Sequence, residues 1–290
     1  MTTTKLTRRT LLKQGIARLK ESPEVTQPGL EALELLGRAL EVDREEIYRK
    51  LDAPVTATQA ARYQGLLQRR LQGEPLQYIT GFQDFMGLKF RVCPDVLIPR
   101  SDTETLVEWA VELLRREKFP FPPRVADVGT GSGAIAISIA KLVPGTEVWA
   151  TEIDGKALEV ARENARRLNA SVRFCQGDML APLVGKKFHL IVSNPPYIPR
   201  GEIAQLPVSV REHEPLLALD GGEDGLLFYR RLAEEAPLFL FPGGYLLVEI
   251  GYNQRQAVEE IFLQAGFCEV TSRRDLAGRE RCVGGYWPGA

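Results

Sequence analysis

The fold of this chain is decided by the stretch Arg124-Val125-Ala126-Asp127-Val128-Gly129-Thr130-Gly131-Ser132-Gly133-Ala134-Ile135-Ala136. A short apolar run passes through a turn with three glycines into a second apolar run of helical character. Glycine lets the backbone turn sharply and lets a ligand lie against it without a Cβ in the way. The stretch therefore predicts a strand, a cofactor-binding turn at Gly129, Thr130, Gly131, Ser132 and Gly133, and a helix.

Strands and helices alternate after this point, which is typical of an α/β fold with a mostly parallel sheet. Strands are expected at residues 124–128, 147–151, 172–175, 189–193, 245–250, 268–273 and 281–286. Helices are expected at residues 134–142, 156–168, 226–240 and 254–264. The last two strands follow one another without a helix, so we expect an antiparallel pair at one edge of the sheet.

The part of the chain before the sheet has a different pattern. Residues 1–74 carry only helical signals, among them the apolar stripe Leu30, Leu33, Leu36 and Leu40, and predict a small helical domain. From residue 75 to 100, short apolar runs alternate with glycine and proline, which indicates a linker with a β-hairpin. The α/β domain would then span residues 101–290.

Acidic residues follow the second and third strands of the predicted sheet. Glu152 comes at the end of the second strand, where a carboxylate can accept hydrogen bonds from ribose hydroxyls. Asp178 comes at the end of the third strand, where it can accept from an adenine amino group, and Met179 can pack on the ring. Because a nicotinamide enzyme also needs a carboxylate at the position of Glu152, these residues alone leave the cofactor open.

The fourth strand delivers Asn194-Pro195-Pro196-Tyr197 to its carboxyl end, where open α/β sheets bind ligands. Pro195 biases Asn194 toward an extended conformation, and the two prolines stiffen the turn. The Asn194 side-chain oxygen and the Pro195 carbonyl can then accept the two protons of a planar amino group, while Tyr197 stacks against its plane. The motif predicts a clamp for a planar nitrogen.

Composition limits the setting. The 290 residues carry 37 Lys and Arg against 38 Asp and Glu, a formal net charge of -1, so no stable nucleic-acid binding is expected. Four separated cysteines and two histidines lack the spacing of a zinc or redox site, which predicts no metal and a reduced, cytoplasmic setting. No apolar run approaches the length of a membrane span. Six basic residues precede the first acidic residue of the chain: Lys5, Arg8, Arg9, Lys13, Arg18 and Lys20. They indicate either a solvated helix face or a surface that binds an anionic partner.

These motifs together resemble a known family. The glycine-rich turn and the Asn194 motif look like an S-adenosylmethionine-dependent methyltransferase that acts on planar nitrogens. Three further segments are similar to the HemK/PrmC glutamine methyltransferases: Gly73-Glu74-Pro75-Leu76-Gln77-Tyr78-Ile79-Thr80-Gly81, Val96-Leu97-Ile98-Pro99-Arg100-Ser101-Asp102-Thr103-Glu104 and Asp275-Leu276-Ala277-Gly278-Arg279.

The resemblance implies a fold, a reaction and a set of site residues. The fold would be the Rossmann-like sheet of class I methyltransferases, with S-adenosyl-L-methionine converted to S-adenosyl-L-homocysteine. The substrate would be the glutamine of the Gly-Gly-Gln motif in class I peptide-chain release factors, methylated on its side-chain amide nitrogen, which modulates translation termination. The cofactor would contact Gly129 to Gly133, Glu152 and Met179; the residues Asn194 to Tyr197 would hold the glutamine, with Asn194 bordering the cofactor as well.

Other functions stay open at this point. A ribosomal-protein glutamine methyltransferase, or an adenine amino-group methyltransferase of DNA or RNA, would need the same clamp. A nicotinamide-dependent oxidoreductase or a non-catalytic cofactor sensor would not need Pro195 and Pro196. The chemistry expected is direct in-line transfer without a covalent intermediate and without an assigned base; for His213 a loop or surface position is favoured over a catalytic role.

Overall fold

The computed structural model describes residues 6–117, 119 and 122–289, and the chain divides into two units. The first, here called the helical unit, contains Met1–Phe82 and the later segment Leu206–His213. The second, here called the sheet unit, contains Gln83–Gln205 and Glu214–Ala290. No helix in the described part of the chain is long and apolar enough to cross a membrane.

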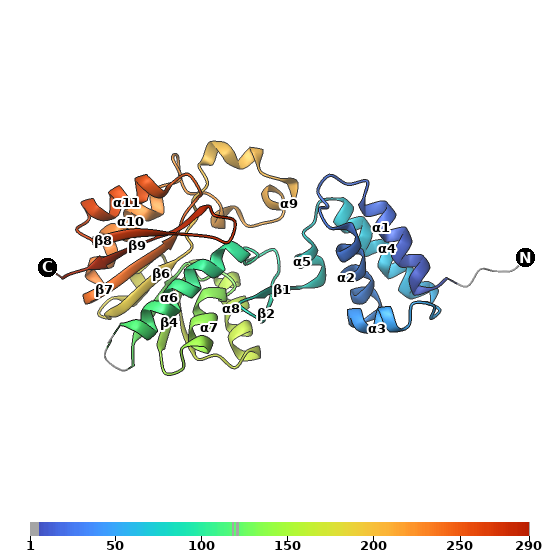
Figure 1. Ribbon diagram of the computed structural model, residues 1–290, viewed down its shortest axis with the longest axis horizontal. Coiled ribbons are helices and arrows are strands. Elements are labelled where there is room, and N and C mark those ends of the chain that lie inside the picture. The colour runs from blue at the N-terminus through green and yellow to red at the C-terminus, as the bar shows by residue number, and fades with distance from the viewer. Residues whose placement is uncertain (1–5, 118, 120–121, 290) are drawn as a thin grey trace, which may run out of the picture. The chain divides into compact units, whose positions relative to one another are not determined.

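The helical unit is built from helices, three of which are capped by side chains (Figure 1). Thr7 caps the first helix, Asp43 caps the third, and Thr56 with Gln59 forms a full capping box on the fourth. The helices are α1 (Arg8–Leu19), α2 (Pro28–Leu40), α3 (Arg44–Arg49), α4 (Ala57–Leu71), α5 (Leu76–Thr80) and, in the later segment, α9 (Val208–Arg211). Helix α5 has no helical signal of its own in the sequence, because its five residues are too few to show periodicity.

The core of this unit is apolar around one tyrosine and holds one buried ion pair. Tyr63 of α4 is fully buried, and its hydroxyl donates to the Ala32 carbonyl of α2 at 3.2 Å. Arg70 of α4 donates to the Glu31 carboxylate at 2.6 Å and to the Glu24 carbonyl at 2.7 Å. The later segment packs here as well, since the Glu24 carboxylate accepts from the Ser209 hydroxyl at 3.3 Å.

A β-hairpin and a helix precede the sheet. Strands β1 (Phe82–Phe85) and β2 (Leu88–Arg91) form the hairpin, and its turn is held by the Glu104 carboxylate, which accepts from the Met86 backbone N–H at 2.6 Å. The 3-10 turn η1 (Ser101–Thr103) leads into α6 (Glu104–Arg116). Asn164 then binds both the N–H and the carbonyl of Arg91, which fixes the hairpin against the following α/β layers.

The sheet has seven strands in the order β5-β4-β3-β6-β7-β9-β8. Neighbouring strands from β5 to β7 are parallel, whereas β9 is antiparallel to both β7 and β8. The bounds are β3 (Arg124–Val128), β4 (Glu147–Glu152), β5 (Val172–Gln176), β6 (Phe188–Ser193), β7 (Leu240–Glu249), β8 (Cys268–Arg274) and β9 (Glu280–Trp287). The predicted α/β fold with an antiparallel pair at one edge is therefore confirmed.

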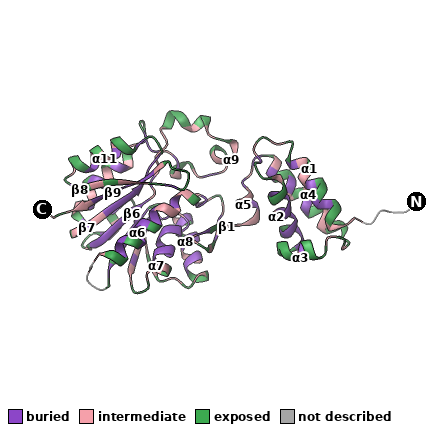
Figure 2. Cartoon of the chain, viewed as in Figure 1, coloured by how far each residue is buried: buried purple, intermediate pink, exposed green. Residues whose placement is uncertain are grey.

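Both faces of the sheet are covered, and Figure 2 shows its central strands as buried. Along β6, Leu190 and Val192 face a core built with α6 and α7, whereas Ile191 faces a second core built with α10 and α11. The helices are α7 (Ala134–Leu142), α8 (Gly155–Arg167), α10 (Leu227–Glu235) and α11 (Arg255–Gln264); the 3-10 turns are η2 (Ala181–Leu183), η3 (Arg200–Gln205), η4 (Leu216–Ala218) and η5 (Ala236–Leu238).

One predicted helix is too long. We expected it to span residues 226–240, but α10 ends at Glu235, η5 follows, and Leu240 already begins β7. Pro237 explains the difference, because it lacks the N–H that would continue the helical hydrogen bonds. The five parallel strands still end together, so Val128, Glu152, Gln176, Ser193 and Glu249 lie along one edge of the sheet.

Candidate active site

A cavity of about 340 Å³ lies at this carboxyl edge of the sheet. It gathers residues that are far apart in the sequence and includes eight of the twelve predicted site residues: Gly129, Gly131, Glu152, Asp178, Met179, Asn194, Pro195 and Pro196. The other lining residues are Asp95, Val96, Leu97, Val128, Ile153, Asp154, Ala157, Gly177, Ser193, Pro215, Leu217, Ala218, Phe228 and Arg231. Open α/β sheets bind ligands at such an edge.

The glycine-rich turn leaves room on the cavity side. Gly129 and Gly131 have φ of 72° and 55°, and a Cβ added at either would meet no heavy atom within 4 Å. Gly133 differs, because a Cβ there would lie 2.8 Å from Ile137 and 3.2 Å from the Ala161 side chain. The first two glycines therefore leave open space beside the cavity, whereas the third permits close packing of α7 against α8.

A buried carboxylate holds the turn from below. Asp127 accepts from the Thr130 hydroxyl at 2.6 Å and from the Ala136 N–H at 3.1 Å. Burial raises the pKa of Asp127 to about 7, against the lowering effect of these two hydrogen bonds. Thr130 thus faces inward, and neither it nor Ser132 nor Gly133 lines the cavity. These three predicted residues therefore contribute to the structure of the turn and not to the cavity lining.

Glu152 is fixed with its carboxylate at the cavity. Its two oxygens accept from the backbone N–H groups of Gly131 at 2.9 Å and Asp154 at 3.1 Å, and the residue is 8% exposed. A carboxylate has about four acceptor positions, so capacity remains for hydroxyl donors. Asp154 caps α8, because its carboxylate accepts from the Lys156 N–H at 2.7 Å.

The third strand contributes Asp178 and Met179 to the opposite wall. Asp178 is paired with Arg231 of α10, whose two terminal nitrogens lie 3.3 and 2.8 Å from its carboxylate oxygens. Met179 is nearly buried, with a left-handed φ of 49°, which turns the chain at the end of β5. Phe228 of α10 lines the cavity as well. Sequence reasoning missed Phe228 and Arg231, because an aromatic and a basic residue on an amphipathic helix carry no local signal of a site.

The Asn194 motif is held by hydrogen bonds on three sides. Its preceding residue Ser193 donates to the Val128 carbonyl at 2.8 Å, and the Tyr197 carbonyl accepts from the Gln254 side chain at 2.9 Å. The Asn194 Nδ2 donates to the Thr103 hydroxyl oxygen at 3.2 Å. This bond leaves the Asn194 Oδ1 as the acceptor on the amide.

Tyr197 is placed beside the cavity wall and not in it. It packs against the second core of the sheet, and burial raises its pKa to about 12. Pro195 and Pro196 do line the cavity, and Pro195 is buried. The motif therefore presents an amide oxygen and a proline-rich turn to a ligand, with the Tyr197 ring packed behind them.

Residues of the preceding and following loops take structural roles. Arg100 donates to both oxygens of the Glu214 carboxylate at 2.7 Å, and burial raises the pKa of Glu214. His213 belongs to the helical unit and does not line the cavity. Arg100 and Glu104 therefore fix the chain around the sheet unit, as ion-pair and turn partners.

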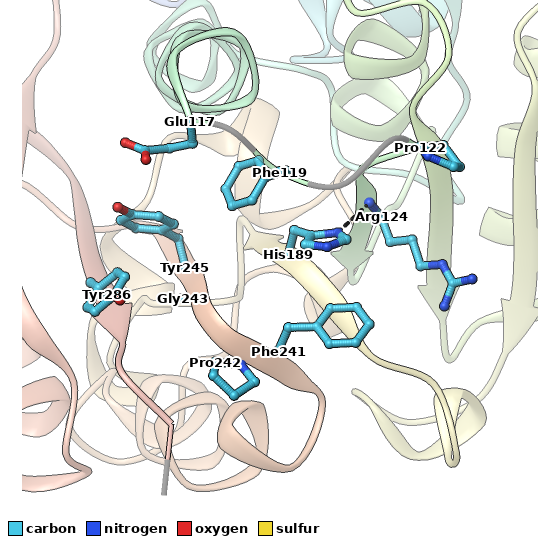
Figure 3. A pocket seen from close by; sticks show the side chains of 10 residues that line it. All are labelled: Glu117, Phe119, Pro122, Arg124, His189, Phe241, Pro242, Gly243, Tyr245 and Tyr286. Atoms are coloured by element: carbon cyan, nitrogen blue, oxygen red, sulfur yellow. Dashed lines mark hydrogen bonds between the residues drawn. The ribbon is translucent and has the colours of Figure 1, made fainter.

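A larger cavity, of about 690 Å³, lies at the opposite edge of the sheet (Figure 3). Its residues come from the end of α6, from Phe119 and Pro122 between α6 and β3, and from β3, β6, β7 and β9. His189 accepts there from the Arg124 backbone N–H at 2.9 Å. None of the predicted site residues is among the ten that line it. The smaller cavity is therefore the candidate active site.

Comparisons with known proteins match two segments of the chain to family models and most of its length to named relatives. Residues 10–81 match the family model for the PrmC N-terminal domain, and residues 108–208 match the methyltransferase small domain. The chain is 46% identical over 285 residues to the release factor glutamine methyltransferase of Moorella thermoacetica, which covers 97% of this chain and 99% of the relative. It is 41% identical over 249 residues to that of Bacillus subtilis, which covers 83% and 85%.

Solved structures agree on the fold. A methyltransferase from Pyrococcus furiosus has a TM-score of 0.51 at 24% identity, over 70% of this chain and 90% of that one. The hMettl16 catalytic domain in complex with MAT2A 3'UTR hairpin 1 has a TM-score of 0.57 at 15% identity, over 97% and 91%. Because relatives at 40–46% identity span most of its length and its sheet is that of a methyltransferase, the chain belongs to the release factor glutamine methyltransferase family.

Proposed function

We propose that this protein transfers a methyl group from S-adenosyl-L-methionine to the side-chain amide nitrogen of the glutamine in the Gly-Gly-Gln motif of class I peptide-chain release factors. The observation that carries the proposal is the orientation of Asn194, whose Nδ2 is bound to Thr103 while its Oδ1 is left to accept at the cavity. The relatives are release factor glutamine methyltransferases, and their activity supplies the substrate class.

The residues around the cavity fit the cofactor. Gly129 and Gly131 leave open space in which a backbone can approach a ligand, and Glu152 keeps acceptor positions for two ribose hydroxyls. Met179 and Phe228 offer apolar surface for a purine ring. When bound, S-adenosyl-L-methionine supplies a methyl carbon on a positively charged sulfur, which is open to attack by a nitrogen lone pair.

The motif residues then orient the substrate nitrogen. A primary amide has two N–H protons in one plane, and Asn194 Oδ1 with the Pro195 carbonyl can accept one each. The amide lone pair is delocalised into its carbonyl, so rate must come from holding the nitrogen close and aligned, an effect worth up to roughly 7 to 11 kcal/mol in favourable cases. One N–H proton leaves to water after transfer, and no residue is assigned as its base.

The test is direct. A purified class I release factor is incubated with this protein and S-adenosyl-L-methionine, and its peptides are analysed by mass spectrometry. We expect a gain of one methyl group on the glutamine of Gly-Gly-Gln. A release factor that stays unmodified, while a ribosomal protein or a nucleic acid in the same assay gains the methyl group, would replace the proposed substrate with that one.

Glu152→Ala is expected to weaken S-adenosyl-L-methionine binding by about 1.5 to 3 kcal/mol, because hydrogen bonds to a charged group are lost. Isothermal calorimetry measures the affinity. The matched control is Glu147→Ala, which removes an acid from the other end of the same strand, where it pairs with Arg124 and Arg173. Unchanged affinity in a folded Glu152→Ala variant would remove this residue from the cofactor site.

The helical unit is proposed to select the protein substrate, because one glutamine side chain offers too little contact for specificity. On α1, Arg8 and Arg9 are paired with Glu46 and Asp52, whereas Lys13 and Lys20 are exposed. Lys5 lies outside the described residues.

Reversing Lys13 and Lys20 to glutamate together is expected to raise KM for an intact release factor severalfold, since a charge at an interface rim acts mainly on association. Turnover of a short Gly-Gly-Gln peptide should stay the same. Lys141→Glu, on the sheet unit, is the control. Equal KM for the intact factor in the double variant and the wild type would exclude this face of α1.

A further inference from the structure

One residue, Thr103, lies between Asn194 and a buried acid, Glu249. Asn194 Nδ2 donates to the Thr103 oxygen at 3.2 Å. The Thr103 hydroxyl lies beside the Glu249 carboxyl, and a side-chain hydrogen bond from Thr103 is among the effects that lower the pKa of that carboxyl. Thr103 is 3% exposed and Glu249 is 1% exposed, so bulk water does not reach this path. Neither residue lines the cavity, whereas Asn194 does.

Glu249 is the last residue of β7, at the same edge of the sheet as the Asn194 motif. Its Oε2 is buried and has no hydrogen-bond partner among the residues that the structure describes. Arg281 is the cation that lowers the pKa of this carboxyl most, and its Nη2 lies 3.0 Å from Asp102 and 3.1 Å from Asp275. A buried acid with so few partners is costly, which calls for an explanation beyond stability.

The chemistry of Asn194, Thr103 and Glu249 fixes which group donates and which accepts in each hydrogen bond of this path. An ionised carboxylate can only accept, so the Thr103 hydroxyl must give its single proton to Glu249. The Thr103 oxygen can then only accept, so the amide group that faces it must be the Asn194 NH₂. The Asn194 oxygen is thereby turned to the cavity, where an acceptor is needed.

We propose that Thr103 and Glu249 are positioning residues that fix which end of the Asn194 amide faces the substrate. The inference rests on the proposed function, because it deepens the role of the amide clamp. Without this path the Asn194 side chain could turn by half a rotation and present its NH₂ to the substrate NH₂, where two donors meet and no bond forms.

The direction of the path depends on the charge of Glu249. Burial raises the pKa of this carboxyl to about 7, while the Thr103 hydrogen bond and the Arg281 charge lower it. A protonated Glu249 can donate to Thr103, which frees the hydroxyl to donate to the Asn194 oxygen. The charged and titratable groups that act on Glu249 from the surrounding elements are Arg100, Asp102, Tyr197, Tyr229, Arg281 and Cys282.

The first experiment measures kcat and KM of release-factor methylation across pH. In the wild type, kcat should fall as the pH is lowered through about 7. Thr103→Val should lower kcat about tenfold or more at pH 8, and Thr103→Ser should restore it. Glu249→Gln should flatten the pH dependence of kcat, and any fall that remains near pH 7 belongs to Asp127, whose pKa is also about 7. The control for loss of a buried hydroxyl is Ser138→Ala in α7, outside the cavity.

A double variant separates positioning from general damage. If Thr103 acts through Asn194, adding Thr103→Val to Asn194→Ala should cost nothing further. The proposal is overturned if Thr103→Val lowers kcat by the same factor in both backgrounds. It is also overturned if Thr103→Ser is as impaired as Thr103→Val, or if Glu249→Gln keeps the wild-type pH profile.

The second experiment follows the Asn194 side-chain amide by NMR in the absence of substrate. The sequence has only four asparagines, Asn164, Asn169, Asn194 and Asn253, so ¹⁵N-asparagine labelling gives few side-chain amide signals, and Asn194→Ala identifies its own by absence. The Asn194 signal should shift with a midpoint near pH 7 in the wild type and stay fixed in Glu249→Gln. A signal that does not titrate overturns the path. A signal that titrates as expected, in a protein that methylates no release factor, supports the path and rejects the proposed substrate.

Discussion

Methyl transfer to a release factor is expected to fall at least about a hundredfold in Asn194→Ala, the scale for losing a contact that positions a reacting group. Affinity for S-adenosyl-L-methionine should stay nearly the same, because Gly129 and Gly131 lie in the turn after β3 and Glu152 ends β4. The hydrogen bonds of Glu152 do not involve Asn194. Single-turnover kinetics with a purified release factor measure the first quantity and calorimetry measures the second.

Two further variants sharpen this result. Asn253→Ala removes an exposed asparagine that lies outside the cavity, and it should behave as the wild type. Tyr197→Ala should reduce turnover less than Asn194→Ala, because the carbonyl that Gln254 binds belongs to the backbone and survives the substitution. Near-normal turnover of Asn194→Ala would rule out the amide clamp.

The free energy of unfolding of the helical unit is expected to fall by about 3 to 5 kcal/mol in Arg70→Met, because the substitution leaves the Glu31 carboxylate buried without its partner. The two side chains are 7% and 11% exposed, so water does not replace the lost bond. Replacing both residues, as Glu31→Leu with Arg70→Met, should recover most of the loss, since an apolar pair removes the stranded charge.

The adjacent residue supplies the control. Arg69 pairs with Glu74 at the surface and is 45% exposed, so Arg69→Met should change stability by no more than about 1 kcal/mol. The three tryptophans, Trp109, Trp149 and Trp287, all belong to the sheet unit. In urea titrations, Arg70→Met should therefore shift the unfolding curve followed by far-ultraviolet circular dichroism while the tryptophan fluorescence curve stays in place. Equal shifts in Arg69→Met and Arg70→Met would contradict the argument.

Local patterns predicted the sheet well. Strand β3 and helix α7 begin and end where the sequence placed them, because the three glycines between them fix the point at which an extended chain turns into a helix. Boundaries shifted where a single residue overruled a longer pattern, as Pro237 does at the end of α10. The last two strands were predicted as an antiparallel pair from the absence of a helix between them, and the sheet order confirms this.

Properties that depend on distant residues could not be predicted. Thr103 and Glu249 are far apart in the sequence, with most of the sheet unit between them. Each has an ordinary local setting, since Thr103 lies in a 3-10 turn and Glu249 at the end of a strand. Phe228 and Arg231 reach the cavity only because α10 packs beside it. The membership of Leu206–His213 in the helical unit likewise has no local signal, since its residues read as a loop between a motif and a helix.

That last feature limits how the gene can be divided. The Glu24 carboxylate contacts Ser209, and a Cβ at Gly73 would lie 2.8 Å from the Val208 side chain, so the helical unit is completed by a segment encoded more than a hundred codons after residue 82 (206 minus 82 is 124). A chimera that takes only the first 82 residues from a relative would join foreign helices to the native Val208 segment. Under the proposed role of the helical unit, an exchange of substrate preference between relatives would require both pieces to be transferred together. Natural recombination at a single crossover between them would separate residues that pack against each other.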